Sequence, residues 1–483
     1  MKYLLLLALC LPQLLLAHTF EVSYTVPDKK PVYAPTVYIV MAQGFRAPRN
    51  RMGDWGNLPI LYSVVDHDFD GKVTIDSTSL GTIPMDQLKG ELKLQAVVRI
   101  NPDWMLPGFG EGDLYSKSQK IEFVKDQKQT LQFEADKAVK APKFRSEGPV
   151  QDHYFKSEKL SEFHKRDYNL RYSVILPKDW SADKKYPVII YVTGFSAVHQ
   201  TSTGRIKRKF GKKGQEAIIV IADANCRWGH SVFANSAVNG PWGDALTYEL
   251  LPHIDKTYGG AGPKHRYITG VSSGGWTAAW AIVNYPEAYA EAWPVSPDPV
   301  DFSAFQELNI TDKKADNLFT KIVKEEQEDR CISLPMLGWT FRNMADFEHA
   351  LGGGGQLQSF AAVFSPKLNK DGTPDQWYNI KDGAVNMQVT DSWTPYDISK
   401  IMQDNWKELA PKLKGKIHYG IHEKDMFHLD HSIRLLEKKC ADLGSDATFT
   451  YFTGVGHHLP SEHAEKLMDS VLKRWNAAPE NKK

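Results

Sequence analysis

Residues 270–274 read G-V-S-S-G, so Ser272 stands between glycines two residues before it and two residues after it. A strand-like run, 266–269, precedes this segment, and a helix-compatible run of small residues and tryptophans follows it. A serine at so sharp a strand-to-helix turn has a strained backbone, and the glycines remove collisions with neighbouring side chains. Its hydroxyl then lies above the helix N-terminus, whose dipole favours a developing oxyanion. The pattern predicts Ser272 as a nucleophile; the alternative, Ser273, breaks the glycine spacing.

A serine hydroxyl needs a general base, and in this arrangement the partners follow the nucleophile along the chain in the order serine, acid, histidine. The glycine-containing loop at 453–458 comes after the last strand-like run and ends in two histidines. We expect His457, directly after Gly456, to be the base, with His458 as the alternative.

The acid is expected after the preceding strand, where it can orient the imidazole and stabilise its charged form. Residues 417–422 form a strand-like run, and Asp425 follows it. Asp425 is therefore the predicted acid. Glu423 and Asp430 are possible substitutes, and Asp298, which follows an earlier strand-like run, is a more remote one.

An oxyanion hole needs a second backbone N–H, which a turn after an early buried strand can supply. The apolar run 187–192 is followed by T-G-F-S at 193–196. We expect the backbone N–H groups of Phe195 and Ser273 to form the pair. Tryptophans near the predicted catalytic strands are candidates for stacking on an aromatic or sugar ring, although packing in the core accounts for them equally well: Trp228, Trp242, Trp276 and Trp293.

The segments that must position these residues change in character along the chain. From about Thr19 to Asp136, short runs of alternating apolar and polar residues are separated by turns, without a long helical period, which predicts a small β-sandwich. Further on, continuous apolar runs such as 217–222 alternate with helical stretches, which is typical of a parallel sheet covered by helices. The predicted fold class is α/β, with a mostly parallel sheet preceded by an all-β domain.

The Lys-rich segment after Asp136 is read as a linker, which places the β domain at 18–140 and the α/β domain at 141–483. Residues from about 297 to 414 fit the sheet pattern poorly and contain four consecutive glycines. We expect them to form a lid-like insertion over the active site.

The first 17 residues predict a secretory signal peptide, because Lys2 is followed by an apolar run that is too short to span a bilayer. Cleavage near Ala17 would give a periplasmic or secreted protein. The mature chain then has an odd number of cysteines, so at most one intramolecular disulfide is expected among Cys226, Cys331 and Cys440. A formal charge of +1 gives no reason to expect nucleic acid or a membrane surface as a partner, and no later segment predicts a membrane span.

Five segments together resemble the putative-esterase family of α/β hydrolases, which includes esterase D, feruloyl esterases, enterochelin esterases and mycolyltransferases: YSVILPKDW, YPVIIYVTGF, DALTYELLPHIDKTYG, YITGVSSGGWTAAW and GVGHH. They are spread over about 168–475, apart from the insertion. The resemblance implies attack by Ser272, hydrolysis of the acyl-enzyme by water that His457 activates, and no cofactor. The family usually has a histidine where this chain has Thr193. This change keeps the backbone donor but alters the hydrogen bonding behind it.

Two further sequence patterns, an acidic segment and a run of basic residues, each have a functional and a structural explanation. Residues 66–71 read D-H-D-F-D-G, the first half of a calcium loop, but Ser77 stands where the bidentate glutamate belongs, so a hairpin turn is expected and no metal site. Six basic residues lie between Arg205 and Lys213, which is typical of a solvated face. Because this run follows the oxyanion turn, binding of an acidic substrate is the alternative.

Together these patterns predict an exported serine carboxylic-ester hydrolase that acts on a small-molecule or glycan-linked ester without a cofactor. Two alternatives use the same scaffold: an acyltransferase to a sugar or lipid hydroxyl, and a non-catalytic glycan-binding protein. No pattern in the sequence indicates the oligomeric state.

Overall fold

The computed structural model describes residues 18–26, 35–53, 58–65, 70–125, 127–312, 317–334, 338–370 and 372–479. The expected signal peptide therefore lies outside the described residues, as do the first four residues of the acidic segment that begins at Asp66.

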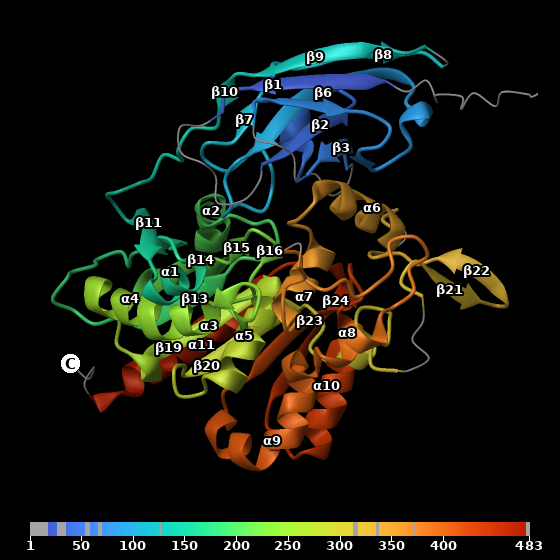
Figure 1. Cartoon of the computed structure of the whole chain (residues 1–483). Coiled ribbons are helices and arrows are strands. Elements are labelled where there is room, and N and C mark those ends of the chain that lie inside the picture. The colour runs from blue at the N-terminus through green and yellow to red at the C-terminus, as the bar shows by residue number, and fades with distance from the viewer. Residues whose placement is uncertain are drawn as a thin grey trace, which may run out of the picture.

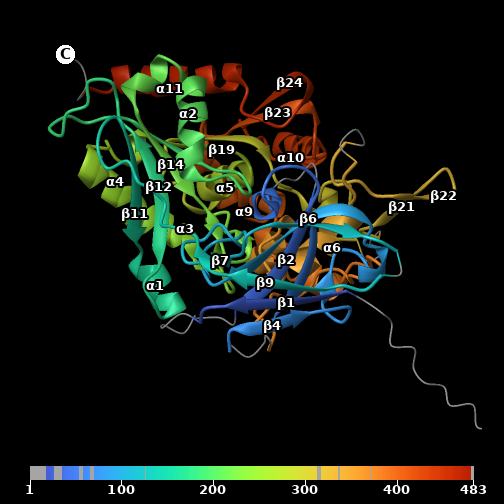
Figure 2. The ribbon, with the colours of Figure 1, turned by 90° about the horizontal axis from the view of Figure 1, so that it is seen from above.

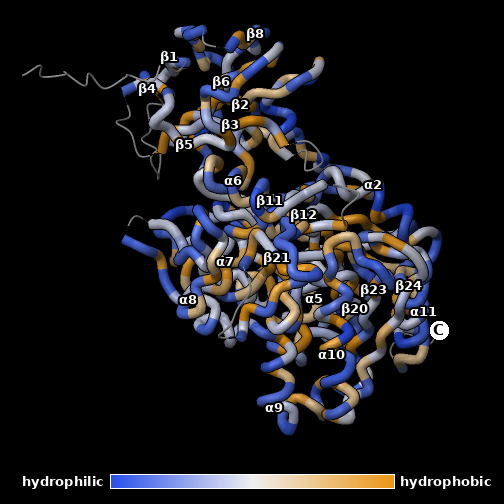
Figure 3. Tube along the Cα trace, turned by 90° about the vertical axis from the view of Figure 1, so that its right-hand side faces the viewer, coloured by the Kyte–Doolittle hydropathy of each residue, from blue (hydrophilic) through white to orange (hydrophobic). Residues whose placement is uncertain are grey.

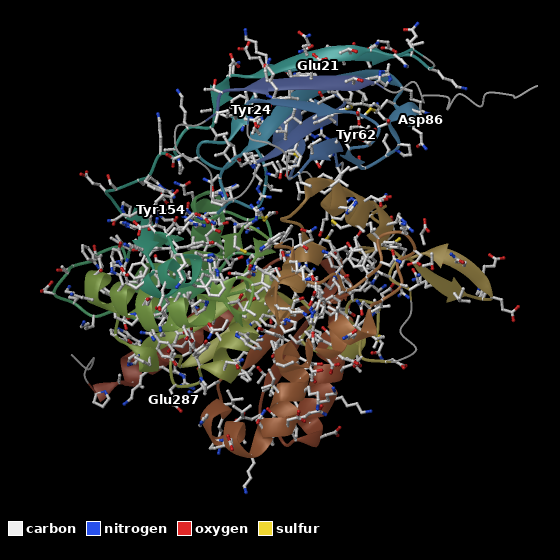
Figure 4. All side chains as sticks on the ribbon, viewed as in Figure 1. Glu21, Tyr24, Tyr62, Asp86, Tyr154 and Glu287 are labelled. Carbon is white, nitrogen blue, oxygen red and sulfur yellow. The ribbon has the colours of Figure 1, made fainter. Side chains whose placement is uncertain are left out.

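Alternating burial gives the N-terminal strands an inner and an outer face. In β1 (Thr19–Tyr24), Phe20 and Val22 are buried while Glu21 between them is exposed, and Figure 4 shows Glu21 on the outer side of the β domain. The other strands of this domain are β2 (Thr36–Ala42), β3 (Ile60–Val64), β4 (Lys72–Ile75), β5 (Leu80–Gly81), β6 (Gly90–Arg99), β7 (Leu114–Tyr115), β8 (Gln119–Phe123), β9 (Thr130–Ala135) and β10 (Lys137–Ala138). One sheet has the order β4-β1-β9 and the other the order β10-β7-β6-β2-β3-β5, with β8 beside β6. Both sheets bury side chains in one apolar core, so this part is a β-sandwich.

Strands β3 and β4, which flank the acidic segment, belong to different sheets of the sandwich. β3 pairs with β2 and β5, whereas β4 pairs with β1 in the three-stranded sheet. The two flanking strands are thus not partners, and most of the turn expected around Asp66 to Gly71 lies outside the described residues.

The central strands of the second domain have no polar face, and they form a largely parallel sheet, as their apolar runs predicted. The strands are β11 (Val150–Lys156), β12 (Asn169–Ile175), β13 (Val188–Val192), β14 (Ile218–Asp223), β19 (Arg266–Ser272), β20 (Glu291–Pro297), β23 (His418–Asp425) and β24 (Thr448–Gly456). Their order is β11-β12-β14-β13-β19-β20-β23-β24. The pairs from β14 to β24 are all parallel, while β12 pairs antiparallel with both of its neighbours. The expected fold class is confirmed.

The second domain also contains helices, several of which cover the two faces of this sheet. They are α1 (Glu158–His164), α2 (His199–Phe210), α3 (Trp242–Asp244), α4 (Leu251–Tyr258), α5 (Ser273–Asn284), α6 (Phe341–Leu351), α7 (Gln356–Phe364), α8 (Met387–Asp391), α9 (Ile398–Leu413), α10 (Asp430–Asp442) and α11 (Ser461–Ala477). In β13, Ile189 and Tyr191 pack in a cluster with α2 and α11, whereas Val188 and Ile190 pack in a cluster with α4, α5, α9 and α10. Figure 2 shows α2 and α11 on the same side of the sheet. In Figure 3 the hydrophobic stretches run through the middle of each domain.

Two-stranded ribbons complete the second domain. They are β15 (Asn225–Cys226) with β16 (Gly229–His230), β17 (Asn235–Ser236) with β18 (Gly240–Pro241), and β21 (Thr320–Val323) with β22 (Glu326–Asp329). The ribbon β21-β22 and helices α6 to α8 belong to residues 298–397, which we name the cap segment. It ends before α9, because that helix packs directly against α5.

The β domain is joined to the cap segment through the end of α6, which lies directly below β3 in Figure 1. Tyr38, Ser63 and Arg99 donate hydrogen bonds of 2.7, 2.6 and 2.8 Å to backbone carbonyls within 350–353. Carbonyls at a helix C-terminus lack partners within the helix, so these side chains satisfy them. A Cβ atom at Gly354 would lie 2.3 Å from a backbone oxygen of the β domain. The glycine run is thus needed for this close approach.

A buried carboxyl group connects α6 with α7. Glu348 accepts the backbone N–H groups of Leu357 and Gln358 at 3.0 and 2.9 Å, at the positive end of the α7 dipole. Burial raises the pKa of Glu348 to about 7, although these hydrogen bonds oppose the shift. The folded chain therefore binds this proton more tightly than the unfolded chain, in which the pKa is about 4.5.

The stability that Glu348 contributes through protonation is fully present below about pH 4.5 and is lost as the pH rises through about 7. We expect this loss to amount to ~3 kcal/mol. Glu348→Gln should flatten the dependence of the urea unfolding midpoint on pH over this range, whereas Glu326→Gln, on the exposed strand β22, should leave it unchanged. An equally steep dependence in Glu348→Gln and the wild type would contradict the assignment.

Candidate active site

The turn from β19 to α5 has the geometry that the glycine spacing predicted. Ser272 has φ +61° and ψ −127°, a conformation that costs ~1–3 kcal/mol for a residue other than glycine. A Cβ atom at Gly270 would lie 2.5 Å from the backbone of Gly274, and one at Gly274 would lie 2.2 Å from the carbonyl oxygen of Val192. Both glycines are required because β13, β19 and α5 approach one another closely here. The serine thus lies at the carboxyl end of the parallel strands, where ligands bind in such sheets.

The register of the last two strands brings an aspartate and a histidine together. Asp425 is paired with Gly456 across β23 and β24, so His457 lies beside the carboxylate, with its Nδ1 3.0 Å from Oδ2. The other carboxylate oxygen accepts the N–H of Phe427 at 2.9 Å, and the Phe427 ring meets the imidazole edge-on. With Nδ1 held by the carboxylate, Nε2 is available for chemistry. His458 instead has its ring 4.5 Å from that of His422.

A second aspartate lies against the serine. Asp298 follows β20, and its Oδ1 accepts a hydrogen bond of 3.3 Å from Ser272 Oγ. Its Oδ2 accepts bonds from Ser273 Oγ at 2.6 Å and from Gln356 Nε2 of the cap segment at 3.2 Å. Burial raises the pKa of Asp298, although these hydrogen bonds and the nearby His457 oppose the shift. The structure therefore places this carboxylate on the serine, while the hydrogen bond to the imidazole comes from the aspartate at the end of β23.

A buried histidine supports the turn after β13. A Cβ atom at Gly194 would lie 3.5 Å from the Cβ of Ser272, so the turn passes beside the serine. His230 accepts the N–H of Val232 on Nδ1 at 3.1 Å, and its Nε2 lies 2.9 Å from the carbonyl oxygen of Thr193. Nε2 therefore carries the proton and donates a hydrogen bond to this carbonyl. Burial lowers the pKa of His230 to about 4, which keeps the ring neutral.

Ser272, His457 and Phe195 border one cavity of about 270 Å³. The other lining residues are Tyr191, Gly194, Ser196, Ala197, Arg205, Val271, Asp298, Gln306, Ile332, Trp339, Met344, Gln356, Phe427 and Leu429. Most are apolar, and several, from Gln306 to Gln356, belong to the cap segment. We name this space the active-site cavity, because it combines a strained serine, a carboxylate-bound imidazole and a turn with backbone donors.

Residues 164–304 match the family model described as putative esterase. The matched segment includes the turn that carries Ser272, and this part of the chain is similar to esterases. No curated protein matches the sequence. The chain is also similar to a solved ferulic acid esterase, with 16% identity over 67% of this chain and 98% of that chain and a TM-score of 0.43. It is similar as well to a solved S-formylglutathione hydrolase from Agrobacterium tumefaciens, with 15% identity over 67% of this chain and 93% of that chain and a TM-score of 0.40.

A third solved structure extends over more of the chain. It is that of a putative dipeptidyl aminopeptidase IV from Bacteroides ovatus, with 11% identity over 86% of this chain and 55% of that chain and a TM-score of 0.39. All three likenesses are distant, and the similarity to esterases rests on the family match of residues 164–304 alone.

The structure does not bring the predicted tryptophans into the active-site cavity. Trp242 and Trp276 are 1% exposed, and Trp276 stacks on a neighbouring tryptophan, Trp280. Trp228 is 8% exposed and packs in a small separate cluster. Trp293 lies beneath α11 in the apolar core of the sheet. Core packing accounts for all four.

Two residues that line the active-site cavity were not indicated by any sequence pattern. Trp339, in the cap segment, contributes an aromatic ring to the active-site cavity. Gln306 has a positive φ of 60°, and its buried Oε1 has no hydrogen-bond partner among the described residues. Neither residue lies in a segment with helix or strand periodicity, which leaves no local signal of its position.

Several other expectations concern groups outside this site. Cys226, Cys331 and Cys440 are free in the structure. Among the described residues, no cluster of three or more histidine, cysteine, aspartate or glutamate side chains is arranged to bind a metal ion. In the same residues, no helix combines the length and the apolar character that crossing a bilayer requires.

The two aspartates of the site can be distinguished by matched substitutions. Asp425→Asn should lower kcat for p-nitrophenyl acetate by about 10⁴-fold, because the imidazole loses the carboxylate that holds its tautomer. Asp298→Asn should lower kcat by about tenfold or less, because the Asp298 carboxylate is bonded to the serine hydroxyl groups and not to the imidazole. Steady-state kinetics on both variants, with circular dichroism as the check of folding, measure the difference. The reverse order of effects would assign the orienting role to Asp298.

Proposed function

We propose that this chain is an exported serine carboxylic-ester hydrolase that works through an acyl-enzyme on Ser272. The observation that carries the proposal is the shared cavity: Ser272 at a strained turn and His457 bound to Asp425 border the same space. The match of residues 164–304 to an esterase family supports the same reaction class.

In the proposed reaction, Ser272 Oγ attacks the ester carbonyl carbon while His457 Nε2 takes the hydroxyl proton. Asp425 stabilises the imidazolium that forms, and the backbone N–H groups of Phe195 and Ser273 stabilise the oxyanion. Collapse of the tetrahedral intermediate breaks the ester C–O bond, and the leaving alcohol takes the proton from His457. Water then attacks the acyl carbon while His457 takes one of its protons. The bond between Ser272 Oγ and the acyl carbon breaks, Oγ takes the proton from His457, and the carboxylic acid leaves.

The first step requires a change from the resting geometry. Ser272 Oγ donates its hydrogen bond to Asp298 at 3.3 Å, so the hydroxyl must rotate toward His457 before it can be deprotonated. A bond of this length is easily exchanged, and catalytic hydrogen bonds often tighten only when substrate is bound.

The domain boundaries and the export of the chain belong to the same proposal. The β domain at 18–140 precedes the esterase domain at 141–483, and the cap segment covers the site. Cleavage near Ala17 is checked by N-terminal sequencing of the exported protein, which should begin at or near His18. A mature protein that keeps residues 1–17 would contradict it.

The acyl-enzyme is tested by partition of a common intermediate. Phenyl acetate and p-nitrophenyl acetate are hydrolysed in the presence of methanol, and methyl acetate and acetate are measured. If both esters acylate Ser272, the ratio of methyl acetate to acetate is the same for the two leaving groups. Ratios that differ between the esters would contradict a shared acyl-enzyme. When sugars are added, accumulation of acylated sugar in preference to acetate would favour acyl transfer over hydrolysis.

A further inference from the structure

A second cavity, of about 340 Å³, lies beside the active-site cavity, between the β domain and the esterase domain. The two spaces share Ser196, which directly follows Phe195 of the oxyanion turn. The loop between β6 and β7 supplies one wall, and residues near the start of α2 and β15 supply another. Figure 1 shows these parts facing each other, with the β domain above α2 and β15. We name this space the interdomain cavity.

A third cavity continues the same path away from the serine. It has a volume of about 280 Å³ and shares Trp104, Phe109 and Val198 with the interdomain cavity. Tyr154 borders it and is labelled in Figure 4, where it lies on the side of the esterase domain that faces the β domain. The three cavities thus follow one another along the β domain, and each shares at least one lining residue with the next.

The lining of the interdomain cavity combines aromatic rings with hydrogen-bonding groups. Trp104 and Phe109 supply the rings, and Arg46, Asn50 and Asn225 supply polar groups. The guanidinium of Arg171 lies 4.6 Å from the centre of the Trp104 ring. It also donates a hydrogen bond of 3.1 Å to the backbone carbonyl of Asp103, the residue before Trp104. The cation covers one face of this ring and holds the loop in place.

One polar residue of this lining has an unused hydrogen-bonding capacity. Asn225 is 2% exposed, and its Nδ2 donates to Asp223 Oδ1 at 2.7 Å and to the carbonyl of Ala197 at 2.8 Å. These bonds fix the amide so that Oδ1 is the free acceptor, and Oδ1 has no partner among the described residues. A buried acceptor without a donor is costly, and a ligand hydroxyl that reaches Oδ1 after a small shift of the covering atoms would remove that cost.

We propose that the interdomain cavity binds a sugar ring of the substrate whose ester bond is cleaved at Ser272. A sugar ring presents a C–H face, which suits the negative face of an aromatic ring such as Trp104. Its hydroxyl groups are both donors and acceptors, so they match the Asn225 Oδ1 acceptor and the Arg46 and Asn50 donors. An alkyl chain would leave Asn225 Oδ1 without a donor. The β domain thus forms part of the substrate site. This proposal rests on the proposed esterase function.

The test measures binding without turnover. Ser272→Ala protein is titrated calorimetrically with unesterified xylotetraose, cellotetraose and chitotetraose, and with tetraalanine as a peptide. We expect at least one saccharide to bind one site per chain and tetraalanine not to bind. Trp104→Ala should weaken that binding about tenfold or more, and Asn50→Ala should weaken it as well. Tyr248→Ala, which removes a 60% exposed aromatic side chain outside these cavities, should leave it unchanged.

Three results would overturn the proposal: no binding of any saccharide, binding that is equally tight in Trp104→Ala and Asn50→Ala, or binding of tetraalanine alone. The Asn50→Ala variant keeps the test decisive if Trp104→Ala does not fold. Turnover of p-nitrophenyl acetate by the wild type is measured separately. If the wild type does not turn over p-nitrophenyl acetate, the proposed function is contradicted. If it does so but binds no saccharide, only the sugar site is contradicted.

Discussion

Ser272→Ala is expected to lower kcat/KM for p-nitrophenyl acetate by about 10⁴- to 10⁶-fold, because no other group can form the ester bond of the acyl-enzyme. The residual rate would come from the oxyanion turn and from substrate binding. Thermal unfolding should change little, since alanine at this position removes only the hydroxyl and its 3.3 Å bond to Asp298. Steady-state kinetics and thermal melting measure the two effects.

The neighbouring serine provides a matched control for this prediction. Ser273 is fully buried, and its hydroxyl donates to Asp298 at 2.6 Å. Ser273→Ala keeps the backbone N–H that the oxyanion requires, so activity should fall by about tenfold or less. A larger loss in Ser273→Ala than in Ser272→Ala would move the nucleophile by one residue and contradict the account.

His457→Ala should lower kcat by about 10⁴- to 10⁶-fold, whereas His458→Ala should keep it within about threefold of the wild type. The difference follows from geometry. His457 Nδ1 lies 3.0 Å from Asp425 and the residue borders the active-site cavity, while His458 lies against His422. Kinetics of both variants on p-nitrophenyl acetate test the expectation. Comparable losses in the two variants would contradict the assignment of a single base.

The catalytic turn could be predicted from the sequence because short-range steric constraints determine it. Gly270 and Gly274 are required by contacts under 3 Å with neighbouring backbone, and such contacts leave a fixed spacing around Ser272. The pairing of Asp425 with His457 was predictable for a related reason. Both residues end neighbouring strands of a parallel sheet, so the chain order that the fold imposes also brings them together.

The walls of the active-site cavity were not predictable in the same way. Asp298 reaches Ser272 from a different strand, 26 residues along the chain, and the sequence indicated it only as a remote alternative acid. Trp339 and Trp276 are equivalent as residue types, yet one borders the cavity and the other is 1% exposed in the core. Only the packing of the cap segment against the β domain and the sheet decides between these positions.

The most direct test of the central claim is covalent labelling with a fluorophosphonate, followed by peptide mapping of the adduct. The wild type should gain one adduct per chain, on Ser272 in the peptide that contains G-V-S-S-G, and His457→Ala should react far more slowly. Ser272→Ala should gain none. An adduct on Ser273 or another serine, or a folded wild-type protein that does not react, would contradict the account.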